Sequence, residues 1–98
     1  MTKDQWLDNK TKELFVAILL LKTADEAAKF FRDLLTQKEI AEFANRWRVA
    51  GLLDQRVRYT EIAKETSMSS TTIARIQKWL KKGAGGYKLI LERLKEKR

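Results

Sequence analysis

The chain has 98 residues, of which 44% are apolar and 35% charged, and its net charge of +8 favours a polyanionic partner. Its longest apolar run, residues 14–21, is far shorter than the roughly 20 residues that cross a bilayer, and the start MTKDQWLDNK does not resemble a secretory signal. The absence of cysteine and histidine excludes disulfides and thiolate metal sites and removes the commonest general base. We therefore expect a single cytoplasmic domain that is not an enzyme and holds no metal or cofactor.

Three helices are predicted in the first half of the chain. The first, over residues 3–22, is apolar around most of its circumference, which indicates that it is covered on two sides. The second, over residues 24–34, and the third, over residues 37–55, each carry an apolar stripe at helical spacing. Both stripes should face a core.

Helix boundaries should be marked by capping residues, because the chain contains no proline. In a capping box, a hydroxyl and a Glu or Gln three residues later satisfy two backbone amides that the helix leaves unpaired. The pattern occurs at three places: Thr2 with Gln5, Thr23 with Glu26, and Thr36 with Glu39.

Three shorter helices are predicted in the second half, over residues 59–66, 70–81 and 87–96. Gly83 follows the second of these and suits the left-handed position that ends many helices. The fold class is therefore all-α with six helices. We divide the single domain 1–98 into dimerisation helices (1–55), a helix-turn-helix (59–81) and a C-terminal helix (87–98).

The assignment of a helix-turn-helix rests on the spacing of small and apolar residues. Such a motif needs a small residue where its helices cross and apolar residues at fixed offsets from it. Ala63 supplies the small residue, and the apolar positions are Ile62, Met68, Ile73 and Ile76. Ser67 stands in the turn where many such motifs have glycine, a departure that is tolerated if the backbone relaxes there.

Charge and side-chain size both point to DNA as the partner of this motif. Residues 1–44 carry seven Lys or Arg and eight Asp or Glu, whereas residues 45–98 carry fourteen and five. The outer face of the second motif helix has short hydroxyls and basic groups that suit base edges and phosphates. The predicted DNA contacts are Arg56, Arg58, Ser69, Ser70, Thr71, Thr72, Arg75, Lys78, Lys81 and Lys82. The alternative is a helix hairpin whose outer face is merely solvated.

The run LLTQKEIAEFANRWRVAGLLDQRVRYTEIAKETSMSSTTIARIQKWL, residues 34–80, resembles the tryptophan repressor family. The ending GAGGYKLILERL is similar to its Trp-repressor-like YerC/YecD-type branch. The resemblance implies six helices in the same order and an intertwined homodimer in which the outer helices of two chains share one core. It also implies a bacterial-type repressor that binds double-stranded DNA.

The resemblance further implies an effector pocket between the third helix and the recognition helix. Thr36, Arg46 and Arg75 match a threonine and two arginines that flank the corepressor in that family. Ile76 and Trp79 stand where its tryptophan-responsive members have glycine and serine. Both substitutions add bulk, and the second removes a polar anchor, so we do not expect L-tryptophan to bind. We expect Trp79 to belong to the core, and the alternative is a pocket for some other ligand, so the small-molecule effector is unknown.

The sequence thus predicts a sequence-specific transcription regulator, a repressor associated with the nucleoid, that reads the major groove with helix 70–81 as a homodimer. Two alternatives remain from other classes. One is a helix-turn-helix that binds RNA or forms part of a transposase-like assembly. The other is a module whose basic face binds an acidic protein partner.

Overall fold

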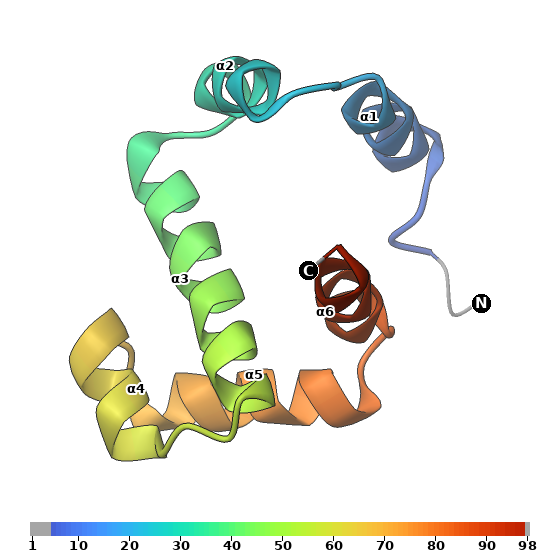
Figure 1. Cartoon of the computed structure of the whole chain (residues 1–98). Helices are drawn as coiled ribbons and strands as arrows, with labels where there is room; N and C mark the ends of the chain where they lie inside the picture. The colour runs from blue at the N-terminus through green and yellow to red at the C-terminus, as the bar shows by residue number, and fades with distance from the viewer. Residues whose placement is uncertain (1–4, 98) are drawn as a thin grey trace. The chain divides into compact units, whose positions relative to one another are not determined.

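The computed structural model describes residues 5–97, which form six α-helices and no strand (Figure 1). The helices are α1 (Asn9–Leu19), α2 (Ala24–Leu34), α3 (Gln37–Asp54), α4 (Tyr59–Thr66), α5 (Ser70–Lys82) and α6 (Gly86–Glu96). The predicted all-α fold is confirmed, and five of these helices agree with the predicted bounds to within one residue. Within the described residues, no helix has the length and apolarity that crossing a membrane requires.

The first helix begins later than predicted, at Asn9 rather than at residue 3. Asp8 is its N-cap, and one carboxylate oxygen accepts hydrogen bonds from the backbone N–H and the hydroxyl of Thr11, both at 2.9 Å. These bonds, the backbone one above all, lower the pKa of Asp8. This cap was not predicted from the sequence. Of the predicted capping pair Thr2 with Gln5, Thr2 lies outside the described residues.

The chain divides between Ile40 and Ala41 into two compact units, each described here by itself. In the first unit, neither α1 nor α2 has a buried residue. The expectation that α2 faces a core is therefore not met within one chain. The predicted capping box at the start of α2 is half formed: the Thr23 hydroxyl accepts from the Glu26 N–H at 3.1 Å, but Glu26 accepts from the Lys22 N–H at 2.9 Å rather than from the N–H of the N-cap Thr23.

The second unit contains the hydrophobic core. Its buried apolar side chains come from the C-terminal part of α3 and from α4, α5 and α6: Val49, Ala50, Leu52, Leu53, Ile62, Ile73, Ile76, Leu80 and Leu91. Two ion pairs on its surface connect α3 to its neighbours. Arg48 meets Glu65 of α4 at 2.6 Å, and Asp54 meets Lys95 of α6 at 3.0 Å.

Helix α3 ends in a Schellman motif with an unusual residue in it. The Val57 N–H donates to the Leu52 carbonyl at 3.0 Å, and the Arg56 N–H donates to the Leu53 carbonyl at 2.9 Å. Arg56 has a φ of 64° at the position where glycine is usual. The motif turns the chain sharply from α3 into α4.

The glycines after α5 differ from the prediction. Gly83 has a φ of −81° and is not left-handed; the left-handed residue is Gly85, with a φ of 92°, which precedes α6. Glycine is needed at position 83 for space instead, because a Cβ there would overlap the carbonyl oxygen of Trp79. The sequence pattern placed the helix end correctly but assigned the conformation to the wrong glycine.

Candidate nucleic-acid interface

Helices α4 and α5 pack as the helix-turn-helix spacing predicts. Ile62, Ile73 and Ile76 are fully buried, and Ala63 and Met68 pack against them. Thr66 is the one buried polar residue among those described, and its hydroxyl donates to the Ile62 carbonyl at 2.7 Å and accepts from the Met68 N–H at 3.3 Å. A buried hydroxyl with both bonds satisfied fixes the entry to the turn at little cost.

The turn between the helices keeps a left-handed backbone at Ser67, with φ 59° and ψ 18°. Its N–H donates to the Ala63 carbonyl at 2.9 Å, which ends α4. The backbone therefore does not relax to suit a residue with a Cβ. Ser67 adopts the conformation that glycine would adopt more cheaply, because a Cβ crowds the neighbouring carbonyl in this region.

The N-terminus of α5 is built by two of the predicted contact residues. Ser69 is the N-cap, and its hydroxyl accepts from the Thr72 N–H at 3.1 Å and donates to the Thr72 hydroxyl at 3.0 Å. These two hydroxyls orient each other. Ser70 and Thr71, by contrast, are exposed, and the structure shows no hydrogen bond from their side chains within residues 5–97.

The outer face of α5 is polar and basic along its whole length. Thr71, Arg75, Lys78 and Lys82 follow one another at steps of three and four residues, so they share one face of the helix, and all four are exposed. This face lies opposite the buried Ile73, Ile76 and Leu80. Such a helix can enter a groove without uncovering its own core.

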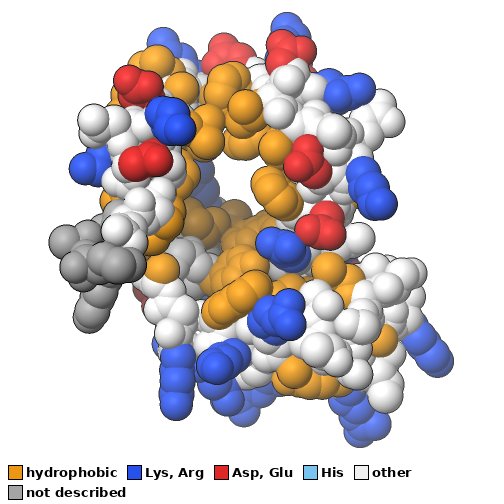
Figure 2. All heavy atoms as spheres, turned by 180° about the vertical axis from the view of Figure 1, so that it is seen from behind, with side chains coloured by type: hydrophobic (Ala, Val, Ile, Leu, Met, Phe, Trp, Pro, Cys, Tyr) orange, Lys and Arg blue, Asp and Glu red, His pale blue; other side chains and the backbone are white. Residues whose placement is uncertain are grey.

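The remaining predicted cations flank this face. Lys81 is exposed in the last turn of α5, and Arg56 and Arg58 are exposed before α4. Arg58 is the N-cap of α4 and makes no capping bond with its side chain. In the lower part of Figure 2, where α4 and α5 lie, Lys and Arg side chains project outward. None of the predicted DNA contacts takes part in the ion pairs found within residues 5–97, so none of these cations has to break such a pair to bind DNA.

A hollow in the second unit is lined by four of the five residues predicted for the effector pocket. It has a volume of about 250 Å³, and its wall includes Arg46, Arg75, Ile76 and Trp79. Thr36 belongs to the first unit and is described only as the cap of α3, where its hydroxyl accepts from the Glu39 N–H at 3.1 Å. The capping box predicted at Thr36 is complete, because Glu39 in turn accepts from the Thr36 N–H at 2.9 Å.

The interior of this hollow differs from the prediction in two respects. Trp79 lines the hollow but is 42% exposed, so the prediction that Trp79 is a core residue is wrong for the single chain, whereas Ile76 is fully buried. Glu42 also lines the hollow and pairs with Arg46 at 2.9 Å. Glu42 was not predicted, although a glutamate four residues before an arginine on one helix indicates an ion pair.

No group of three or more His, Cys, Asp or Glu side chains that could hold a metal ion occurs in the part of the chain that the structure describes. The site is therefore one of surface chemistry: hydroxyls and cations displayed on a helix that is fixed from behind by a packed core. This combination defines an all-helical helix-turn-helix protein.

The comparisons with known proteins agree with that class and identify the family. The sequence model of the Trp repressor protein family matches residues 9–95. Over 96 residues the chain is 38% identical to a Bacillus subtilis relative described as "Uncharacterized protein YerC", a match that covers 98% of this chain and 92% of the relative. The chain belongs to the Trp repressor family, which is a family of regulators rather than of enzymes, and the predicted resemblance is confirmed.

Two solved structures share the fold. A TrpR-like protein from Eubacterium eligens has a TM-score of 0.85 and 40% identity, over 89% of this chain and 90% of that one. A protein from Staphylococcus aureus titled a putative Trp repressor has a TM-score of 0.86 and 34% identity, over 97% of this chain and 96% of that one. The six-helix Trp-repressor-like fold is therefore confirmed.

Proposed function

We propose that this protein is a sequence-specific transcription regulator, a repressor, that acts in the cytoplasm on the nucleoid and reads the major groove with α5 as a homodimer. The observation that carries the proposal is the exposed face of Thr71, Arg75, Lys78 and Lys82, which is held opposite a fully buried core. Its hydroxyls and guanidinium can bond base edges, and its ammonium groups can bond phosphates. Membership of the Trp repressor family supports the same function.

The first unit supports the homodimer. Its helices bury none of their own side chains, and Trp6, Phe15, Val16, Leu19, Leu20 and Leu34 are all exposed. A soluble chain seldom leaves this much apolar surface uncovered, and a second copy is the partner that a symmetric regulator uses. Two copies would present two α5 helices to successive turns of the major groove.

We also propose that DNA binding does not require L-tryptophan. The support is the lining of the 250 Å³ hollow. The side chains of Ile76 and Trp79 form part of its wall, and Arg46 is already paired with Glu42. The hollow is smaller than the roughly 300–1,000 Å³ of most small-molecule sites. Calorimetry with millimolar L-tryptophan should show no saturable heat, and DNA affinity should be the same with and without it. Tryptophan binding that tightens DNA affinity tenfold would overturn this part of the proposal.

The function is tested by selecting bound duplexes from random oligonucleotides with the purified protein and then measuring affinity for the selected site. We expect one enriched motif with two half-sites and weaker binding to single-stranded RNA of the same sequence. Enrichment of RNA over duplex DNA, or no nucleic-acid binding at any sequence, would favour the RNA-binding or acidic-partner alternative and reject the proposal.

Two variants separate groove reading from phosphate contact. Lys81→Ala should weaken all DNA sequences alike and reduce the salt dependence of binding by about one unit of slope. Thr71→Ala should instead relax the preference at one base pair, by about 1 kcal/mol or more. Lys29→Ala on α2 removes a charge outside the interface and is the control. Loss of binding with the control but not with Lys81→Ala or Thr71→Ala would mean that the interface lies elsewhere.

A further inference from the structure

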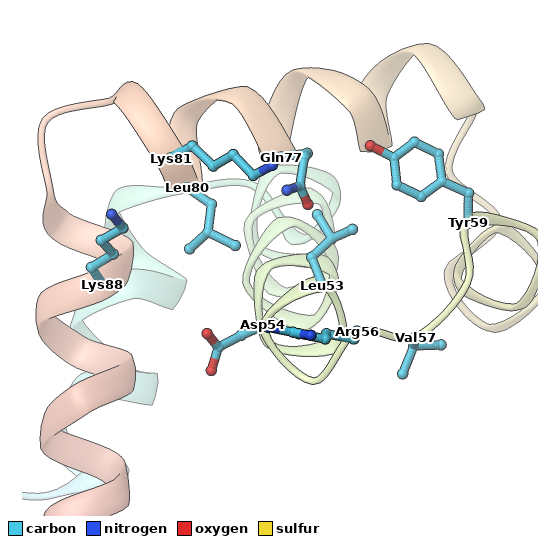
Figure 3. A pocket seen from close by; sticks show the side chains of 9 residues that line it. All are labelled: Leu53, Asp54, Arg56, Val57, Tyr59, Gln77, Leu80, Lys81 and Lys88. Atoms are coloured by element: carbon cyan, nitrogen blue, oxygen red, sulfur yellow. The ribbon is translucent and has the colours of Figure 1, made fainter.

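Another hollow lies in the second unit, beside α5, and shares none of its lining residues with the predicted effector pocket (Figure 3). It has a volume of about 630 Å³ and is lined by residues from the end of α3, the start of α4, the second half of α5 and the start of α6. No pattern in the sequence indicated a cavity here. Tyr59, Gln77 and Lys88, which line it, belong to no predicted site.

The charge of this hollow is strongly positive. Three cationic side chains line it, Arg56, Lys81 and Lys88, and none of them is in an ion pair within residues 5–97. Its one carboxylate, Asp54, is already neutralised by Lys95 at 3.0 Å. In Figure 3, Lys81 and Lys88 come from α5 and α6 respectively, and Arg56 from the loop after α3. Three unpaired cations from three elements form a field that attracts an anion.

Arg56 occupies its place in this hollow at a conformational cost. Its φ of 64° is the one that glycine adopts freely at the end of a helix. A residue with a Cβ is less stable there by about 1–2 kcal/mol. Backbone outliers of this kind gather at binding sites, where the side chain contributes something that glycine would not.

Much of the remaining wall is apolar or aromatic. Leu53, Val57 and Leu80 form an apolar part of the wall, and the half-exposed ring of Tyr59 adds an aromatic face. The volume is much larger than a single phosphate group needs and falls within the roughly 300–1,000 Å³ of small-molecule sites. The wall therefore combines two chemistries, cations and polar tips with an apolar and aromatic surface.

We propose that this hollow is a regulatory site for a small organic polyanion, a molecule that joins phosphate groups to an aromatic or apolar part. Arg56, Lys81 and Lys88 bind the phosphates, the Gln77 amide and the Tyr59 hydroxyl complete their hydrogen bonds, and the apolar wall holds the rest of the ligand. The regulation rests on the proposed DNA binding, because Lys81 and Arg56 are also predicted to contact DNA phosphates. A bound polyanion neutralises these two cations, so the ligand and DNA exclude each other.

Binding is measured first without DNA, by calorimetry with ATP and with inorganic tripolyphosphate in buffer free of divalent cations. We expect one site per chain and an affinity for ATP about fivefold higher than for tripolyphosphate, because only ATP contacts the apolar and aromatic wall. Lys88→Gln should weaken both ligands by about tenfold, as expected for loss of a charge-assisted bond. Lys64→Gln, which removes an equal charge from α4 outside the hollow, should leave both affinities within twofold.

DNA is added second, at constant ionic strength. ATP at ten times its dissociation constant should weaken the apparent DNA affinity by about tenfold, and Lys88→Gln should abolish this effect while leaving DNA affinity itself within twofold. Equal losses with Lys88→Gln and Lys64→Gln would show that only diffuse charge is sensed and would overturn the proposal. So would absent ATP binding together with weaker DNA binding by Lys88→Gln, since the hollow would then hold backbone phosphates. ATP binding in a protein that binds no DNA would keep the site but remove its regulatory role and the proposed function.

Discussion

The two units of this chain differ in whether their apolar side chains are buried within the unit. The second unit buries nine apolar side chains from four helices and displays a polar recognition face. The first unit has two capped helices, neither of which has a buried residue, and Leu19 at the end of α1 and the C-cap Leu20 are 82% and 73% exposed. Good caps and propensity therefore form helices without forming a core. The proposed homodimer would cover the exposed apolar side chains of the first unit, and the core of the second unit lies behind the proposed DNA-binding face.

The largest effect, on association of the chains, should come from charging the exposed apolar residues at the end of α1. We expect the wild-type protein to sediment at about twice the 11.5 kDa chain mass at micromolar concentration, and Leu19→Glu with Leu20→Glu to shift it to the mass of one chain. Two charges buried against a partner's apolar surface should weaken association by at least about a hundredfold. Lys12→Glu, at an exposed polar position of α1, is the control. A wild-type protein of single-chain mass would remove the homodimer and the two-half-site geometry together.

A smaller loss is expected from truncating the core that the second unit has and the first lacks. Ile73→Ala removes a fully buried side chain between α4 and α5 and should lower the free energy of unfolding by about 3 kcal/mol. Urea denaturation followed by circular dichroism measures this change. Lys64→Ala on the exposed side of α4 should stay within about 0.5 kcal/mol. If Ile73→Ala cost less than 1 kcal/mol, the packing behind the recognition face would be looser than the structure indicates.

A gain in stability is expected at the turn of the helix-turn-helix. Ser67→Gly removes the crowding of a Cβ at φ 59°, which stabilises the folded state. Glycine also raises the conformational entropy of the unfolded chain, so the free energy of unfolding should rise by only about 0.5–1 kcal/mol. The matched control is Ser70→Gly, inside the first turn of α5, which should be destabilising by a similar amount. Destabilisation by Ser67→Gly would indicate that the serine hydroxyl stabilises the turn in the folded state.

The smallest effect concerns the cap of α1 and its dependence on pH. The pKa of Asp8 is lowered because its ionised form accepts the Thr11 hydrogen bonds, so this contribution is present above the carboxyl's ordinary pKa and is lost as the pH falls through the lowered value. Helix content measured by circular dichroism should fall slightly in that acidic range. Asp8→Asn, which caps without titrating, should remove this part of the pH dependence. An unchanged profile would mean that the cap contributes nothing measurable.

The sequence by itself determined the local features of this protein. Hydroxyl-to-glutamate spacings located the starts of α2 and α3, and the offsets from Ala63 to Met68, Ile73 and Ile76 located the helix-turn-helix, because these patterns depend only on neighbours along the chain. The exposed basic face of α5 followed from the same periodicity. The start of α1 was misplaced because the spacing of Thr2 and Gln5 suggested an earlier cap, whereas the helix begins after Asp8, a cap with no capping-box partner.

Tertiary structure decided everything that depends on segments meeting in space. Only packing shows that Trp79 is exposed while Ile76 is buried, since the sequence puts both on the apolar side of one helix. The structure has the left-handed backbone at Gly85 rather than at Gly83, where glycine is needed because a Cβ would overlap the carbonyl of Trp79. The 630 Å³ hollow joins residues from four helices and one loop, spread over 36 positions from Leu53 to Lys88, and no local pattern marks such a set.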